Sequence, residues 1–106
     1  MFVSIESGAY AEFRRSLATG NLTLIRATAA ELPQVPLDDA LQVCLLLRGA
    51  EPARYDRAVL RWLARFTGER AFSLGQLKVA IAAFEGLAEN PARSERQLRG
   101  LLDRSA

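Results

Sequence analysis

The sequence contains no histidine and only one cysteine, and this scarcity limits the chemistry that the chain can perform. Histidine is the usual general base near neutral pH, a common ligand of zinc, and the activating partner in Ser–His and Cys–His pairs. Cys44 lies in the apolar stretch Val43–Leu46, where we expect a core residue rather than a nucleophilic thiolate. The sequence has no glycine-rich phosphate loop, nucleophile elbow or calcium-loop spacing. We therefore predict no enzyme activity, no catalytic residues, and no bound cofactor or metal.

Long hydrophobic runs are also missing. The longest uninterrupted one, Val43–Leu47, is far shorter than the ~20 residues that a transmembrane helix needs. The segment Met1–Glu6 has neither the basic region nor the long apolar region of a secretory signal. These features predict a cytoplasmic protein that does not associate with membranes.

Of the 106 residues, 50% are hydrophobic and 25% are charged, which predicts one globular domain covering residues 1–106. The net charge is only +2, and Lys78 is the only lysine among 14 basic residues. Abundant arginine and alanine are typical of a GC-rich genome, so arginine content alone is weak evidence for nucleic-acid binding. The basic residues concentrate in the middle of the chain, between residues 48 and 70, where positive potential should be highest.

Helical periodicity and helix-end signals recur along the whole chain. Asn21 is a typical N-cap, and Ser73 with Gln76 three residues later forms a capping-box pattern. Gly20, Gly49, Gly68 and Gly86 follow helical patterns, so we expect them to end helices in the left-handed conformation. No segment alternates convincingly between apolar and polar residues, and no Asn-Gly or Asp-Gly hairpin turn occurs. The predicted helices cover residues 7–19, 22–32, 37–48, 52–67, 73–89 and 91 onward.

The fold class predicted from these patterns is all-α, a compact bundle or short stack of five to six helices. The helix at 37–48 is apolar nearly all round, and the next two have wide apolar arcs, so these three helices should be central. Two sets of residues are expected to form the apolar faces of the later two helices. The first is Tyr55, Val59, Leu60, Trp62, Leu63 and Phe66, and the second is Leu74, Leu77, Ile81, Phe84 and Leu87.

Two pairs of carboxylates deserve consideration as catalytic or cation-binding groups. Asp38 and Asp39 are adjacent, so on a helix they point about 100° apart and cannot share one proton. Glu85 and Glu89 are four residues apart and could share a helix face, where they could contribute to a site for a hard cation. A solvated helix face explains the second pair more simply.

Four arginines of the helix at 52–67, which we call the arginine row, form the candidate binding surface. Arg54, Arg57, Arg61 and Arg65 fall within about 80° of arc at 100° per residue. Like charges four residues apart repel, so acidic groups should lie nearby, either on a partner or within the chain. Candidates within the chain are Asp38, Asp39, Glu85 and Glu89. The arginine row is thus either an ordinary solvated face or a surface that contacts an acidic partner.

The helices at 37–48 and 52–67, joined through Arg48–Pro52, have roughly the lengths of a helix-turn-helix. A recognition helix exposes polar side chains at its N-terminal end to read bases. The arginine row instead runs along the whole helix, which favours contacts with a phosphate backbone or a protein.

Several stretches resemble a group of small uncharacterised helical proteins of high-GC actinobacteria. The resemblance rests on residues 17–22, 31–41, 53–58 and 61–63, and it extends over most of residues 9–88. It implies a bacterial cytoplasmic protein, and it carries over no known activity and no functional residues.

Together these observations predict a non-enzymatic helical module that binds another protein or a second copy of itself. The alternative is a nucleic-acid-associated protein that uses the arginine row, with Arg93, Arg96 and Arg99 adding positive charge.

Overall fold

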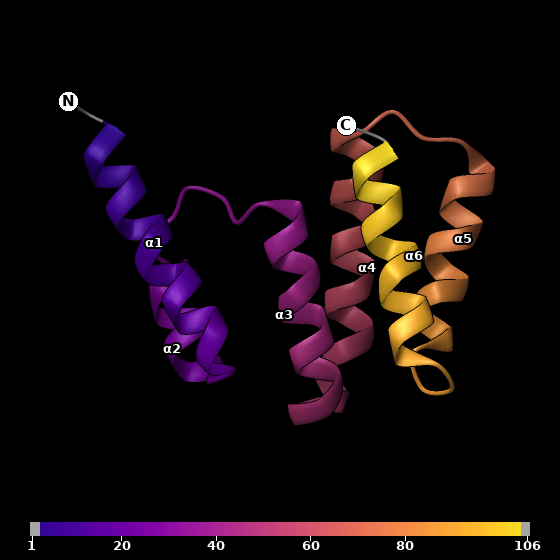
Figure 1. Cartoon of the computed structure of the whole chain (residues 1–106), viewed down its shortest axis with the longest axis horizontal. Coiled ribbons are helices and arrows are strands. Elements are labelled where there is room, and N and C mark those ends of the chain that lie inside the picture. The colour runs from indigo at the N-terminus through magenta and orange to yellow at the C-terminus, as the bar shows by residue number, and fades with distance from the viewer. Residues whose placement is uncertain (1–2, 105–106) are drawn as a thin grey trace. The chain divides into compact units, whose positions relative to one another are not determined.

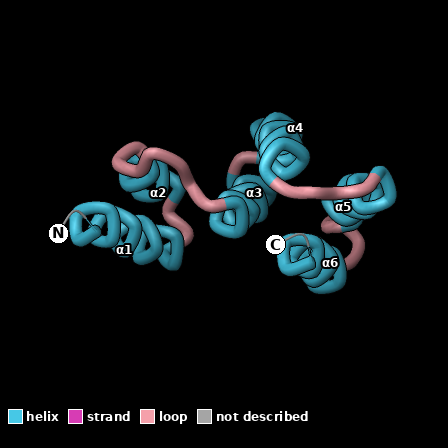
Figure 2. The backbone as a smooth tube through the Cα atoms, turned by 90° about the horizontal axis from the view of Figure 1, so that it is seen from above, coloured by secondary structure: helices cyan, strands magenta, loops and turns pink. Residues whose placement is uncertain are grey.

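The computed structural model describes the backbone of residues 3–104 and the side chains of residues 8–103. Within this part of the chain, six α-helices and no strands are present (Figures 1 and 2). They are α1 (Val3–Thr19), α2 (Leu22–Ala29), α3 (Leu37–Ala50), α4 (Pro52–Glu69), α5 (Leu74–Gly86) and α6 (Pro91–Arg104). The predicted all-α class is confirmed. None of the described helices is long and apolar enough to cross a bilayer.

The helices divide between two compact units, residues 1–55 and 56–106. Unit 1 contains α1, α2, α3 and the first turn of α4, whereas unit 2 contains the rest of α4 together with α5 and α6.

In unit 1, a tight turn joins α1 to α2. Gly20 adopts a φ of 71°, and its N–H donates to the carbonyl of Leu17 at 3.2 Å. The side chain of Asn21 then caps α2 by accepting from the N–H groups of Thr23 and Leu24, as the sequence predicts. The two helices pack against each other, and their buried hydrophobic side chains are Phe13, Leu17, Leu22 and Ile25.

Helix α2 ends three residues earlier than predicted, and residues 30–32 form a turn followed by a bend. Two backbone hydrogen bonds stabilise this segment. The N–H of Glu31 donates to the carbonyl of Thr28, and the N–H of Leu32 donates to the carbonyl of Ala29. Proline disfavours the helical conformation in the residue before it, so Pro33 limits how far the helix can continue.

Helix α3 buries a stripe of four side chains, Leu37, Leu41, Cys44 and Leu47. Asp38 and Asp39 lie in its first turn and Arg48 in its last, an arrangement that suits the helix dipole. Only Glu51 separates α3 from α4. A helix-turn-helix motif joins its helices by a turn of about three to four residues, so this connection does not match one.

In unit 2, aromatic rings determine which side of α4 is buried. The Trp62 ring stacks on Phe66 at 5.3 Å between centroids and meets Phe84 of α5 edge-on at 5.4 Å. Phe66 also contacts Phe72, which follows α4. The predicted burial of Trp62 and Phe66 is therefore confirmed.

Helices α5 and α6 of unit 2 pack closely. The capping box predicted for α5 is present, with Ser73 and Gln76 each bonding the backbone N–H of the other. A Cβ atom added to Gly86 would lie 2.9 Å from Oγ of Ser94 on α6, which shows how near the two helices come. The buried hydrophobic side chains of α6 are Leu98, Leu101 and Leu102. The Arg70 guanidinium donates a hydrogen bond to the Leu102 carbonyl at 3.0 Å.

The left-handed conformation predicted for the four glycines is wrong in three cases. Among the described residues, only Gly20 has a positive φ. Gly49 and Gly68 lie inside α3 and α4, and Gly86 is the last residue of α5. The helices pass through Gly49 and Gly68 because a glycine costs only about 1 kcal/mol in a helix, which is too little to end one.

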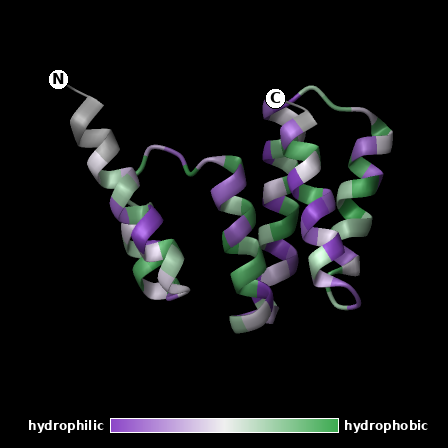
Figure 3. Ribbon diagram, in the orientation of Figure 1, coloured by the Kyte–Doolittle hydropathy of each residue, from purple (hydrophilic) through white to green (hydrophobic). Residues whose placement is uncertain are grey.

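The predicted apolar face of α5 is also partly wrong. Leu74 is 76% exposed and Ile81 is 42% exposed, whereas Ala80, Ala83 and Phe84 are buried. The close approach of α6 requires small side chains on α5, so the helix turns its alanines inward. Leu60 of α4 was expected to widen the apolar stripe but is 67% exposed. Figure 3 shows that each helix of unit 2 contains both hydrophobic and hydrophilic residues.

Candidate binding surface on helix α4

Helix α4 presents the candidate surface because its opposite side is fixed by the aromatic core of unit 2. Val59, Trp62 and Phe66 are buried, and they recur every three to four residues along one side of the helix. Arg57, Leu60 and Arg61 lie away from that side and are exposed. We call these three residues the α4 face.

The four residues of the arginine row fall into two classes. Arg54 forms an ion pair with Glu51 at 3.3 Å, and Arg65 forms one with Glu69 at 2.9 Å. Arg57 and Arg61 have no ion pair or side-chain hydrogen bond within residues 8–103. The charge available to a partner is therefore concentrated on the two central arginines.

The carboxylates that neutralise the ends of the row are not those considered from the sequence. Asp38, Asp39, Glu85 and Glu89 form no ion pair with the row in the described part of the chain. Glu69 is four residues after Arg65 and Glu51 is three before Arg54, so helical spacing could have identified both. Glu51, the residue between α3 and α4, also accepts a hydrogen bond from Arg26 of α2 at 2.7 Å, so it has partners on both α2 and α4. The Arg26 guanidinium lowers the pKa of Glu51.

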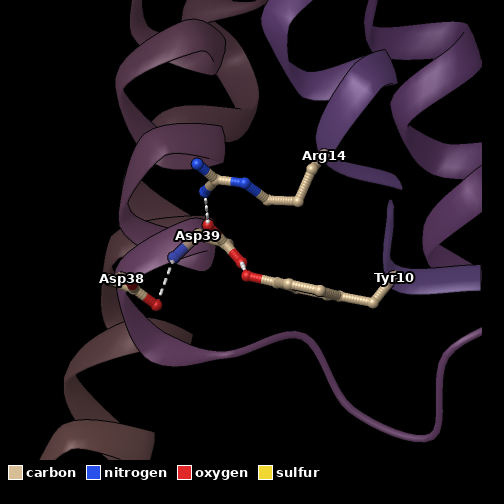
Figure 4. Close-up of polar contacts among 4 residues, drawn as sticks. All are labelled: Tyr10, Arg14, Asp38 and Asp39. Carbon is tan, nitrogen blue, oxygen red and sulfur yellow. Dashed lines mark hydrogen bonds and ion pairs between the residues drawn. The ribbon is translucent and has the colours of Figure 1, made fainter. Parts of the chain in front are cut away.

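A polar cluster in unit 1 joins α1 to α3 and was not anticipated from the sequence. Asp39 is only 1% exposed, and the Tyr10 hydroxyl donates to its Oδ2 at 2.6 Å (Figure 4). Arg14, one turn further along α1, forms an ion pair with Oδ1 of the same carboxylate. The hydrogen bond to Asp39 raises the pKa of Tyr10, because ionising the phenol would remove the donated proton.

This cluster is a structural contact that holds α1 to α3. Each oxygen of Asp39 has a partner from α1, and no buried side-chain nitrogen or oxygen in the described residues lacks a hydrogen bond. The neighbouring Asp38 is exposed, and its Oδ1 accepts from the N–H of Asp39 at 3.0 Å. Asp38 and Asp39 therefore have different surroundings and different partners.

The other chemically interesting residues occupy ordinary positions. Cys44 is buried as predicted, and burial raises the pKa of its thiol to about 11. Glu85 lies on α5 but Glu89 lies in the turn after it, so the predicted shared helix face is interrupted at Gly86. Nowhere among residues 8–103 do three metal-ligating side chains of His, Cys, Asp or Glu come together.

Comparison of the chain with protein-family models, with curated proteins and with solved structures finds no match in any of the three. The resemblance to helical actinobacterial proteins stays a prediction, and any functional argument rests on the geometry of the chain's own residues.

Proposed function

We propose that this chain is a non-enzymatic helical module that binds another protein through the α4 face. The observation that carries this proposal is the position of Leu60, which is 67% exposed between two unpaired arginines. An apolar side chain flanked by guanidinium groups matches an acidic protein surface that has an apolar pocket between its carboxylates. Arginine suits such a contact because its planar group can form paired hydrogen bonds with a carboxylate.

Three further observations support a binding role rather than catalysis. The sequence lacks histidine, the Cys44 thiol has a raised pKa, and the buried carboxylate of Asp39 is already engaged by Tyr10 and Arg14. A bacterial cytoplasmic location is part of the same proposal and rests on the resemblance to actinobacterial proteins.

A nucleic-acid role is the second candidate, favoured by the exposure of Arg57 and Arg61 without intramolecular partners. Four phosphate contacts by the whole arginine row would give a log–log salt slope of about −3.6 on duplex DNA. Since Arg54 and Arg65 are held by carboxylates, two contacts and a slope of about −1.8 are expected instead. Leu60 would contribute nothing to such binding, because phosphates offer no apolar surface.

The experiment compares proteins captured from bacterial cytoplasm by immobilised wild type, Leu60→Ser and Arg57→Gln/Arg61→Gln. Leu24→Ser is the matched control, since Leu24 is also an exposed leucine but lies on α2. A protein retained by wild type and the control, but lost by both α4 variants, supports the proposal. A set of captured proteins that is the same for all four baits contradicts it.

A titration with duplex DNA at low salt separates the second candidate from the first. DNA binding that is lost in Arg57→Gln/Arg61→Gln and unchanged in Leu60→Ser would favour the nucleic-acid role. Protein binding predicts no measurable DNA affinity at physiological salt.

A further inference from the structure

Helix α5 carries a second exposed face, separate from the α4 face. Leu74, Lys78, Ile81 and Glu85 are all exposed, and at 100° per residue they lie within about 60° of arc. We call these four residues the α5 face. It lies on the side of α5 away from Ala80 and Ala83, which are buried.

The α5 face carries one positive and one negative side chain, so two copies of this face can attract each other. Lys78 and Glu85 are seven residues apart, which is about 10 Å along the helix axis and too far for a pair within one helix. Neither has an ion pair or side-chain hydrogen bond in the described part of the chain. One cation and one anion thus flank the apolar side chain of Ile81.

We propose that the α5 face pairs with the same face of a second copy of this chain, with the two α5 helices antiparallel. A two-fold axis passing between residues 81 and 82 places Lys78 of each copy level with Glu85 of the other. It also brings the two Ile81 side chains together at the axis. This arrangement makes two ion pairs around one apolar contact, as an isologous interface requires.

The size of the face determines the strength of the dimer. Four side chains of a 13-residue helix cover much less than the roughly 800 Å² per partner of a standard stable interface. The dimer is therefore expected to be weak and reversible, and to form only at high protein concentration.

Charge reversal tests this geometry. Lys78→Glu or Glu85→Lys turns two attractive contacts of the dimer into two repulsive ones, so each should raise the dissociation constant about tenfold. The double variant Lys78→Glu/Glu85→Lys restores both ion pairs and should return the dissociation constant to within about twofold of wild type. Residues three and four positions from Lys78 are uncharged, so its reversal disturbs no pair within the helix.

Ile81→Ser tests the apolar contact, with Val79→Ser as its control. The two residues are both β-branched and almost equally exposed, at 42% and 41%, but they point about 160° apart on α5. Ile81→Ser should weaken self-association at least tenfold, and Val79→Ser should leave it unchanged. Circular dichroism of each variant verifies that the helices are retained.

Sedimentation velocity over a range of protein concentrations measures all of these constants. Wild type that remains monomeric at about 1 mM overturns the proposal. So does a double charge variant that stays as weak as the single ones with its helices retained, or a Val79→Ser variant as weak as Ile81→Ser. Leu60→Ser should not affect self-association, so this proposal and the one for the α4 face can fail separately.

Discussion

The hydrogen bond between Tyr10 and Asp39 gives a quantitative test of how unit 1 is held together. Tyr10→Phe removes one hydroxyl and leaves Oδ2 of a carboxylate that is 1% exposed without its donor. Hydrogen bonds to charged groups contribute about 1.5–3 kcal/mol. Tyr10 itself is partly exposed, so water can replace part of the interaction, and we expect a loss of about 1.5 kcal/mol.

Amide hydrogen exchange measures this loss at the helices concerned. Amides of α1 and α3 should exchange about tenfold faster in Tyr10→Phe, because 1.4 kcal/mol corresponds to a factor of ten. Trp62 lies in unit 2, so its fluorescence during urea denaturation reports on the other unit and should change less.

A double-mutant cycle isolates the interaction. Once Asp39→Ala has removed the acceptor, adding Tyr10→Phe should cost almost nothing more. If Tyr10→Phe costs less than about 0.5 kcal/mol, or costs the same with and without Asp39, the reasoning is refuted.

Three other predictions concern the pKa of Tyr10, the burial of Cys44 and the two glycines Gly68 and Gly86. The raised pKa of Tyr10 means that the folded state binds more protons than the unfolded state above about pH 10, so stability falls as pH rises through this range. Wild type should therefore lose more stability than Tyr10→Phe between about pH 9 and pH 11 in urea titrations, and equal losses would contradict the assignment. Cys44 has a pKa of about 11, so iodoacetamide should alkylate it at least about a hundredfold more slowly than a free cysteine at neutral pH. Unfolding in urea should remove this protection, and rapid labelling of the folded chain would place the thiol at the surface. Gly68→Ala should stabilise unit 2 by about 0.5–1 kcal/mol, because an added Cβ meets no atom within 4 Å. Gly86→Leu should destabilise unit 2 by about 1–3 kcal/mol, because the new side chain would clash with Ser94. Thermal melts of both variants measure the difference, and shifts of the same sign would show that α5 and α6 are not closely packed at this position.

The sequence alone determined the features that depend on neighbours within about four residues. Asn21 and the Ser73–Gln76 pair could be assigned as caps because capping hydrogen bonds span only two or three residues. The burial of Trp62 and Phe66 could be predicted because the arginines of α4 occupy the opposite side, although the same pattern did not show that Leu60 is exposed. The exposure of Arg57 and Arg61 follows from the same periodicity.

The tertiary structure decided the features that depend on residues far apart in the chain. Asp39 and Tyr10 are 29 residues apart, and no local pattern shows that a first-turn aspartate will be buried against another helix. Helix α5 is hydrophobic on several sides, so the sequence permits more than one buried face. The close approach of α6 at Gly86 selects the side with Ala80 and Ala83, and it leaves Leu74 and Ile81 exposed. A small side chain lets two backbones approach more closely than a large one, and that gain exists only when the second helix is in place.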